Sequence, residues 1–526
     1  MDSDSRDEVE CNNRTRLSRR GFLTVASGAA AATLLAACGG GTDTSTPTPA
    51  AAPAKPTAAG GATTAPSTGS GTSASGATAA RGSSVAGNGT VSAGAGAATA
   101  VPQPAGNYNY PTALKKGVTL RYQTFWAQYR IDILKQSITD FTQRTGINVT
   151  VEPFGSADDY RSNLATTMAA GTASDVFIAD IWNMVKYYDA GLVLDVADRL
   201  KADGIDLNKD YGLVGLEQYC GKTYMLPFVL SPHGWYYNKT MLKEVGAKDP
   251  WDDLNGQWTF DDFREIALKI TQSGGGKRWG AKLDPKVEYQ WDPIINTYGG
   301  AVTDFTAKPP KYAIDQPKSL EALSMIQNWY TKDKIILPPD QSKALTDQGV
   351  TSPFAAKLVG LMEESTGQIT FLMQNVKDFE WDIAPPLRKT KDVAPIGHAD
   401  GDPTAIFAKT KYPDEAYAFA KHLAGPVTQE ILAKNKLLTP TLKAAAASEV
   451  YLNPPPKNMH VFPDVLVGVY HTSFYHGNGL ETSRQLDNFA EELVLGSKSP
   501  SDAAAVAKDV NSKVKFGGCT PTYVGG

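Results

Sequence analysis

The feature that most constrains the fold is an alternation of strand-like and helix-like segments near residue 120. The segments are a strand at 118–122, a helix at 131–145, a strand at 147–151, a helix at 160–170 and a strand at 175–179. The first helix has an apolar stripe that includes Ile131, Leu134 and Ile138, and Gly146 ends it. Strands that alternate with helices predict a parallel sheet covered on both faces, so the fold class is α/β.

Polar and aromatic residues follow the first and third of these strands. Ligands of open parallel sheets bind beyond the carboxyl ends of the strands. Trp126 follows the first strand, and Asp180 and Trp182 follow the third. We therefore expect these three residues to contact a ligand. The alternatives are a core position for each tryptophan and a helix cap for Asp180.

The N-terminus has the pattern of an export signal. Arg19 and Arg20 lie in Ser-Arg-Arg-Gly-Phe-Leu, which matches the twin-arginine pattern, and a modestly apolar run too short to span a bilayer follows. Leu-Ala-Ala-Cys at 35–38 resembles a bacterial lipobox. We expect residues 1–37 to be a signal peptide and Cys38 to carry lipid on the outer face of the cell membrane. The alternative is a chance arginine pair before an alanine-rich helix.

Residues 38–106 are predicted to form a disordered tether behind the lipidated cysteine. They are mostly Gly, Ala, Ser, Thr and Pro, and such a segment buries too little apolar surface to offset its ordering entropy. The folded part is expected at 107–526, and no later apolar run is long enough to cross a membrane. We therefore expect membrane contact through the lipid anchor only.

Charge and motifs exclude several functions. The net charge is −4, so no basic surface points to nucleic acid. The sequence has no His-Glu-x-x-His, no Cys-x-x-Cys, no Gly-x-Ser-x-Gly and no phosphate-binding loop. We therefore predict no catalytic residue, metal or cofactor, although glycosidase carboxylates leave no local signature.

In an oxidising compartment Cys220 and Cys519 form a possible disulfide, with two free thiols as the alternative.

The segment 224–239 has the composition of a crossing between two lobes. An apolar run interrupted by Pro227 and Pro232 leads into an aromatic strand. Leu226-Pro227 and Tyr237-Asn238-Lys239 resemble the hinge-crossing segment of family 1 extracellular solute-binding proteins, the carbohydrate receptors of ABC importers. Residues 169–176 resemble a further family pattern, with Ser174 in place of proline. Gly191–Asp195 and Trp258–Phe263 add to the resemblance, which spans about 117–515.

The resemblance implies a two-lobe periplasmic-binding-protein fold of type II. Three crossings would join the lobes, each a mostly parallel sheet flanked by helices. Lobe I would comprise about 115–227 and 388–440, and lobe II about 228–387 and 441–526. The implied protein is a monomeric receptor that binds a sugar between its lobes and delivers it to ABC permease subunits, without enzymatic activity. The alternatives are an exported carbohydrate-active hydrolase and a surface adhesion protein.

Aromatic rings pack on the apolar faces of sugars, and carboxylates and amides bind their hydroxyls. The candidate ligand-binding residues are Trp126, Tyr160, Asp180, Trp182, His233, Trp235, Tyr289, Trp291, Glu363, Glu364 and Asp400. Of Glu363 and Glu364, one is expected to contact ligand and the other solvent. The aromatic-rich segment 470–476 is a further candidate for the rim of lobe II. Few of these candidates are basic, which disfavours a phosphorylated ligand.

Overall fold

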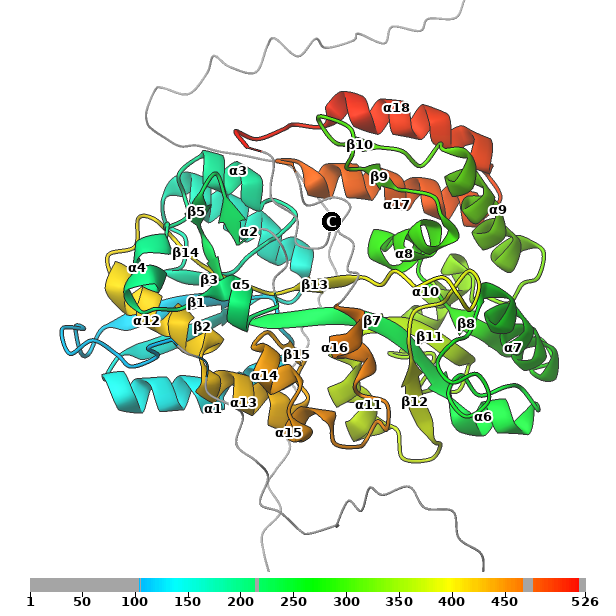
Figure 1. Cartoon of the computed structure of the whole chain (residues 1–526), viewed down its shortest axis with the longest axis horizontal. Coiled ribbons are helices and arrows are strands. Elements are labelled where there is room, and N and C mark those ends of the chain that lie inside the picture. Colours follow the sequence, from blue (N-terminus) through cyan, green and yellow to red (C-terminus); the bar gives the residue numbers. More distant parts are fainter. Residues whose placement is uncertain (1–103, 105, 213–216, 467–475, 520–526) are drawn as a thin grey trace, which may run out of the picture. The chain divides into compact units, whose positions relative to one another are not determined.

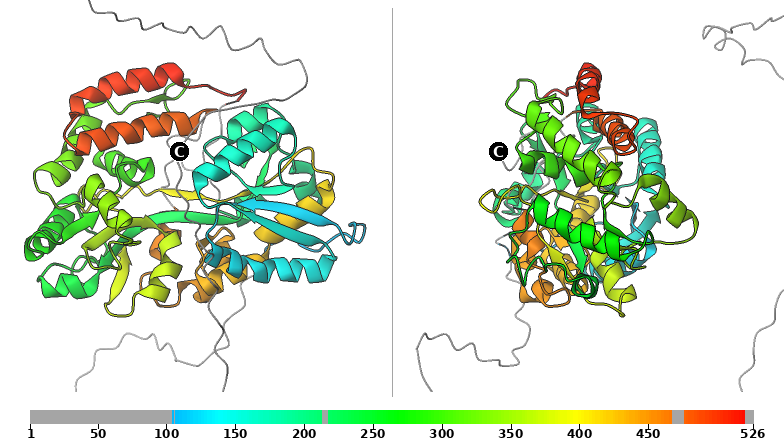
Figure 2. Two further views of the ribbon diagram at one scale, coloured as in Figure 1. Left: turned by 180° about the vertical axis from the view of Figure 1, so that it is seen from behind. Right: turned by 90° about the vertical axis from the view of Figure 1, so that its right-hand side faces the viewer.

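The computed structural model describes residues 104, 106–212, 217–466 and 476–519. The predicted signal peptide, Cys38 and nearly all of the tether therefore lie outside the described residues, as does most of the segment 470–476. Two α/β lobes, each built on its own sheet, make up the described part (Figure 1). Figure 2 shows the same lobes from behind and from the side.

The sheet of the first lobe has the order β2-β1-β3-β14-β6. Its strands are β1 (Thr119–Thr124), β2 (Asn148–Pro153), β3 (Val176–Ile178), β6 (Met225–Leu226) and β14 (Thr404–Ile406). β1 pairs in parallel with β2 and β3, whereas β14 is antiparallel to β3 and β6. The predicted parallel unit is thus confirmed, with β14 inserted in the opposite direction.

Helices occupy the two predicted intervals between β1, β2 and β3, and further helices follow β3 and β14. They are α1 (Gln128–Thr145), α2 (Ala157–Ala170), α3 (Met184–Asp189), α4 (Ala197–Ala202), α5 (Leu207–Asp210), α12 (Pro413–Ala424), α13 (Pro426–Asn435) and α14 (Lys443–Ala446). α1 buries Ile131, Leu134 and Ile138 and ends at Gly146, whose φ of 73° suits a left-handed cap. A short hairpin of β4 (Gln218–Tyr219) and β5 (Lys222–Thr223) completes this lobe.

The sheet of the second lobe has the order β12-β7-β11-β8. Its strands are β7 (Val229–Asn238), β8 (Trp279–Lys282), β11 (Val359–Ser365) and β12 (Trp381–Ala384). β7 is antiparallel to β11 and β12, and β11 is parallel to β8. Three strands therefore share one direction and β7 opposes them, so each lobe has a mixed sheet with one reversed strand.

Helices and short elements cover this second sheet. The helices are α6 (Lys239–Glu244), α7 (Phe260–Ser273), α8 (Glu288–Tyr298), α9 (Pro317–Thr331), α10 (Pro339–Asp347), α11 (Ile369–Asn375), α15 (Glu449–Leu452), α16 (Val461–Val465), α17 (Gly479–Val494) and α18 (Ala503–Lys513). The short elements are β9 (Thr303–Asp304), β10 (Lys311–Tyr312), η1 (Thr366–Gln368) and η2 (Pro500–Asp502). α7 starts with a capping box of Thr259 and Asp262.

Three strands lie side by side where the chain passes between the lobes. β7 pairs near its start with β13 (Ala399–Gly401) and β15 (Thr439–Pro440), and near its end with β11 and β12. This confirms the three predicted crossings. Pro227 does interrupt the chain between β6 and β7, but the expectation that Pro232 breaks the strand is wrong, because Pro232 lies inside β7. The long strand β7 joins the lobes directly (Figure 1).

Each lobe has its own hydrophobic core. Tyr122, Phe177 and Leu230 lie in the first core, and Trp258, Phe263 and Leu361 lie in the second. The first core also takes in residues 228–230 and, beyond the third crossing, Leu442 and Ala445. The first core thus continues a few residues beyond the ends predicted for this lobe at 227 and 440. Across the described part of the chain, no helix is long and apolar enough to cross a bilayer.

Candidate functional site

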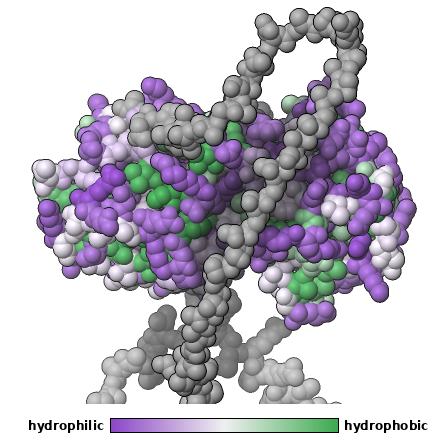
Figure 3. All heavy atoms as spheres, turned by 90° about the horizontal axis from the view of Figure 1, so that it is seen from below, coloured by the Kyte–Doolittle hydropathy of each residue, from purple (hydrophilic) through white to green (hydrophobic). Residues whose placement is uncertain are grey.

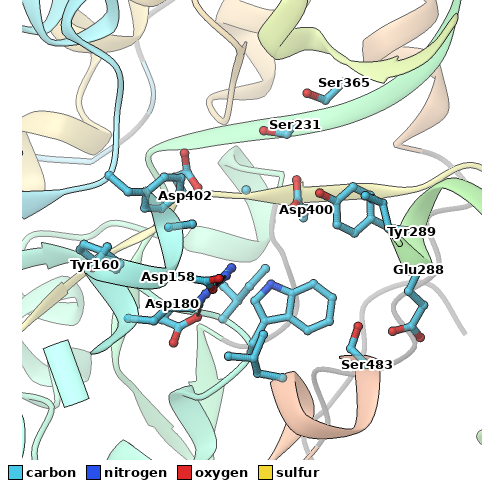
Figure 4. A pocket seen from close by; sticks show the side chains of 18 of the residues that line it. Asp158, Tyr160, Asp180, Ser231, Glu288, Tyr289, Ser365, Asp400, Asp402 and Ser483 are labelled. Carbon is cyan, nitrogen blue, oxygen red and sulfur yellow. Dashed lines mark hydrogen bonds and ion pairs between the residues drawn. The ribbon is translucent and has the colours of Figure 1, made fainter. Parts of the chain in front are cut away.

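A cavity of about 510 Å³ lies between the lobes, and residues of both lobes line it. Figure 4 shows its walls. Ser231 on β7 and Asp400 on β13 lie on one side, and Ser483 on α17 lies on the other. Ser231 and Asp400 are register partners in adjacent crossing strands, so their placement depends directly on backbone pairing. The volume is within the usual range for small-molecule sites, roughly 300–1,000 Å³.

The first lobe contributes the ends of β3 and α2, as the rule for parallel sheets predicts. Asp180 follows β3, is almost fully buried, and is held by two donors. Arg161 Nε donates to its Oδ1 at 3.2 Å, and Asn183 Nδ2 donates to its Oδ2 at 2.6 Å. Tyr160 on α2 donates its hydroxyl hydrogen to the carbonyl of Ile178. These bonds fix one polar wall of the cavity.

The second lobe contributes α8 and α17. Tyr289 on α8 faces the first lobe, and its ring centroid is 6.4 Å from that of Trp182. Behind it, the ring of His398 stacks on Tyr289 with centroids 5.0 Å apart and planes inclined by 21°. Leu480 and Asp487 of α17 also line the cavity. Two aromatic rings from opposite lobes thus meet at the cavity wall.

A buried ion pair lies beside the cavity. His233 Nδ1 is 2.9 Å from Glu363 Oε1, and both side chains are buried. Burial alone lowers the pKa of His233, but the charge and hydrogen bond of Glu363, together with the charges of Glu364 and Asp400, raise the pKa to about 9. Burial raises the pKa of the Glu363 carboxyl, and His233 opposes that shift. At neutral pH the His233 imidazole is therefore protonated, and it lies within ion-pair distance of Glu363.

Two carboxyl groups of the cavity wall titrate unusually. Burial raises the pKa of Asp400 to about 6, partly opposed by the positive charge of His233. Burial also raises the pKa of Asp487 to about 9, and the carboxylate of Glu288 adds to that shift. At pH 7 Asp487 therefore carries a proton that it can donate in a hydrogen bond. The site can bind a hydroxyl group as donor or as acceptor.

Seven of the predicted residues line this cavity: Tyr160, Asp180, Trp182, His233, Tyr289, Glu364 and Asp400. Their contact with a ligand stays a prediction. The structure also separates the two neighbouring glutamates, since Glu364 faces the cavity and Glu363 pairs with His233 behind it. Asp180 accepts from side chains here, so the cap alternative does not describe it.

Three predicted tryptophans and Glu363 do not line the cavity, which corrects our expectation for them. Trp126 is 2% exposed, stacks on Phe228 and donates from Nε1 to Asp402 Oδ2 at 2.6 Å. Trp235 and Trp291 lie in the second core. In each case the large apolar ring gains more from burial in its own lobe than from the cavity wall.

Sequence reasoning missed several lining residues. They are Arg130, Asp158, Arg161, Ser231, Lys286, Glu288, Ser365, Asp402, Ser483, Arg484 and Asp487. Asp402 lies just after β13, two residues beyond Asp400, and this proximity was a usable signal. The residues of α17 carry no such signal, because only the fold brings them to the cavity. Among the described residues, no group of three or more His, Cys, Asp or Glu side chains is placed to hold a metal.

The predicted disulfide is confirmed. Cys220 and Cys519 are bonded, although 299 positions separate them in the sequence. Cys220 occupies the turn of the β4–β5 hairpin, where its φ of 52° and the φ of 74° at Gly221 suit a tight hairpin turn.

Comparison with known proteins agrees with this architecture. A binding-protein candidate of Brucella abortus (strain 2308) is 25% identical over 321 residues, 58% of this chain and 71% of that protein. An ABC substrate-binding protein of Listeria monocytogenes, solved with cycloalternan, superposes with a TM-score of 0.66 at 20% identity, covering 76% of this chain and 99% of that one. UgpB of Mycobacterium tuberculosis, solved with glycerophosphocholine, gives a TM-score of 0.63 at 18% identity, with coverage of 75% and 98%.

The family assignment rests on a match to a family sequence profile. Residues 127–430, more than half of the chain, match the sequence profile of the family described as bacterial extracellular solute-binding protein. That span begins between β1 and α1, and it includes the other strands of both sheets and the first two crossings. The chain therefore belongs to the bacterial extracellular solute-binding proteins.

Proposed function

We propose that this chain is the sugar receptor of an ABC importer, anchored to the outer face of the cell membrane through a lipid on Cys38. It binds a sugar between its lobes and delivers it to the permease subunits as a monomer. The observation that supports this most is the cavity, which combines two aromatic rings with hydroxyl and carboxyl groups from both lobes. The likeness to the Listeria protein solved with cycloalternan supports the same ligand class.

The charges of the cavity favour a sugar over an anionic solute. Among the described lining residues, seven carboxyl side chains face four Arg or Lys side chains. Three of those bases already have carboxylate partners: Arg161 binds Asp180, Arg484 binds Asp158 and Lys286 binds Glu491. An incoming phosphate would have to compete with these carboxylates. Neutral hydroxyls can use both the acceptors and the protonated donor.

A thermal-shift screen of the full chain against sugars, polyols, amino acids and phosphate esters tests the proposal. A ligand that binds only the folded state raises the melting temperature as its concentration increases. We expect a sugar class to raise it and phosphate esters to leave it unchanged. Glu364→Gln in the cavity wall should reduce the shift, whereas Glu244→Gln, a matched change at a side chain that is 58% exposed, should not. A response to amino acids alone would refute the sugar class.

As a receptor, the protein binds the sugar without hydrolysing it. Asp180 and Glu364 lie in one cavity on opposite lobes, as the paired carboxyls of a hydrolase would. Turnover of aryl glycosides separates the two functions, because a receptor releases no phenol. An adhesion protein would instead present a broad flat apolar patch. On the face shown in Figure 3, the hydrophobic residues that are coloured form separate patches in a mostly hydrophilic surface.

A further inference from the structure

The C-terminal segment 514–519, which we call the strap, is bonded to both lobes. It leaves α18, whose Ala503, Ala507 and Val510 lie in the second core. It ends at Cys519, which is disulfide-bonded to Cys220 beside Tyr219 of the first core. The disulfide therefore joins the lobes covalently, in addition to the three crossing strands.

The strap is fitted closely at both ends. On the second lobe, Lys515 donates its backbone N–H to Asn478 Oδ1 at 2.8 Å, and Gly477 donates to the carbonyl of Lys515 at 2.8 Å. On the first lobe, Cys519 donates its backbone N–H to the hydroxyl of Tyr219 at 3.0 Å. Gly517 approaches so closely that a Cβ atom there would lie 2.2 Å from the same hydroxyl oxygen.

The strap and the crossing strands lie on opposite sides of the cavity. Ser231 and Asp400 mark the side of the crossing strands, and Ser483 of α17 marks the other side (Figure 4). Asn478, which holds the strap, directly precedes α17. In Figure 1 the strap, drawn in red, runs from α18 toward α3 of the first lobe, on the side away from β7. A rotation about the crossing strands that opens the cavity would therefore pull on the strap.

We propose that the disulfide-anchored strap limits how far the two lobes can open. This inference rests on the proposed receptor function, in which the lobes open and close around a ligand. Opening first separates Arg484 from Asp158, an exposed pair at 2.7 Å that offers little resistance. The hydrogen bonds of the strap break next, but the disulfide remains. The six residues after Lys513 then span about 20 Å at most, which sets the limit of travel.

A limited opening has a consequence for affinity. The apparent dissociation constant of a ligand rises as the fraction of protein in the binding-competent state falls. The oxidised protein should keep its lobes near the binding geometry, and the reduced protein should spend more time fully open. Reduction of the disulfide should therefore weaken ligand binding without changing any residue of the cavity. The strap lies outside the part of the chain that matches the family profile, residues 127–430.

The test measures the distance between the lobes without a ligand. Dyes are attached through non-natural amino acids at Lys201 on α4 and Lys318 on α9, both exposed, in the full chain. Cys11 and Cys38 are replaced by serine, so that Cys220 and Cys519 are the remaining thiols. We expect single-molecule energy transfer to shift to lower efficiency when the protein is reduced, and equally in the variant with Cys220→Ser and Cys519→Ser. That variant should not respond to reductant.

A second variant keeps the disulfide and lengthens the strap. Four Gly-Ser residues inserted after Val514 add about 13 Å of reach and should lower the transfer efficiency while the protein stays oxidised. Circular dichroism confirms that each variant is folded. Identical distance distributions in all forms would overturn the proposal. Because no ligand is needed, failure of the strap proposal is distinct from failure of the receptor function, which the ligand screen decides.

Discussion

The bond between Trp126 and Asp402 gives the sharpest test of how this site is held. The indole was expected to face a ligand, but it lies in the first core and donates to Asp402, which lines the cavity. Both Trp126→Phe and Trp126→Ala lose the N–H donor, although phenylalanine keeps a ring against Phe228. We therefore expect both changes to weaken ligand binding. If Trp126 were a stacking platform for ligand, phenylalanine would largely replace it.

The geometry of the Trp126–Asp402 hydrogen bond indicates how much it contributes to stability. Trp126 Nε1 and Asp402 Oδ2 are 2.6 Å apart and Trp126 is 2% exposed, so the bond is short and shielded from water. A hydrogen bond to a charged group contributes about 1.5–3 kcal/mol to stability. Trp126→Phe also leaves empty space, which adds a separate cost. A double-mutant cycle with Asp402→Ala, which removes the acceptor, separates that cost and should leave a coupling of about 1.5–3 kcal/mol.

The pH dependence of the coupling has a definite sign. Burial raises the pKa of Asp402, and the N–H of Trp126 opposes that shift by favouring the carboxylate. Without the N–H the pKa of Asp402 rises further. When a carboxyl has a higher pKa in the folded state than in the unfolded state, the protein loses stability as the pH increases through the folded-state pKa. The cost of Trp126→Phe should therefore be larger at pH 8 than at pH 4.

Urea denaturation followed by circular dichroism measures the cycle, provided that two probes give coincident transitions. Thermal shift with the ligand from the screen measures the effect on binding. A coupling below about 0.5 kcal/mol, which is the usual scatter for independent sites, would refute the role assigned to the bond. Full ligand affinity in Trp126→Phe together with its loss in Trp126→Ala would restore the stacking role.

Three further changes test the buried charges and the packing. Glu363→Gln leaves His233 without its carboxylate partner and should cost roughly 3–5 kcal/mol, measured by urea denaturation, whereas Glu244→Gln on the surface should be nearly neutral. The pKa of His233 is raised to about 9 in the fold, so its contribution to stability is complete below about pH 6.5 and is lost as the pH rises through 9. Melting temperatures measured from pH 6 to 10 should fall accordingly. In His233→Gln this pH-dependent fall should be absent. Gly280→Ala places a Cβ atom 2.4 Å from the backbone oxygen of Ala267 and should lower the free energy of unfolding by about 1–3 kcal/mol. Gly496→Ala lies in open space with a φ of 81° and should lower it by about 1 kcal/mol or less. Equal losses in the two variants would contradict the close packing at Gly280.

Much of the fold was predictable because its determinants are local. The apolar stripe of α1, the glycine that ends it and the capping box of Thr259 and Asp262 each act within a few residues. The role of Pro232 was not predictable in this way. A proline removes one backbone donor, but the neighbouring positions of β7 still pair with β13 and β15, so the strand continues through it.

The candidate site was predictable only where it follows strand ends. Asp180 and Trp182 came from the rule for parallel sheets, and both line the cavity. The same rule failed for Trp126, because position after a strand does not decide whether a large ring turns into the core or into the cavity. Trp235 and Tyr237 show the same limit: they are two residues apart on β7, share one side of the strand, and both pack in the second core.

The features that no local pattern indicates are those made by contact between the lobes. Arg484 on α17 meets Asp158 on α2 across 326 positions of sequence, and the strap reaches Cys220 across 299. Arg484 and Asp158 are ordinary surface residues when each lobe is considered alone, so composition and periodicity do not mark their contact, whereas the cysteine count did mark the two ends of the disulfide. A solute receptor needs contacts of this kind, because a ligand can favour the closed state only through groups that meet across the cleft. The part of the chain that governs opening and closing is therefore the part that its sequence shows least directly.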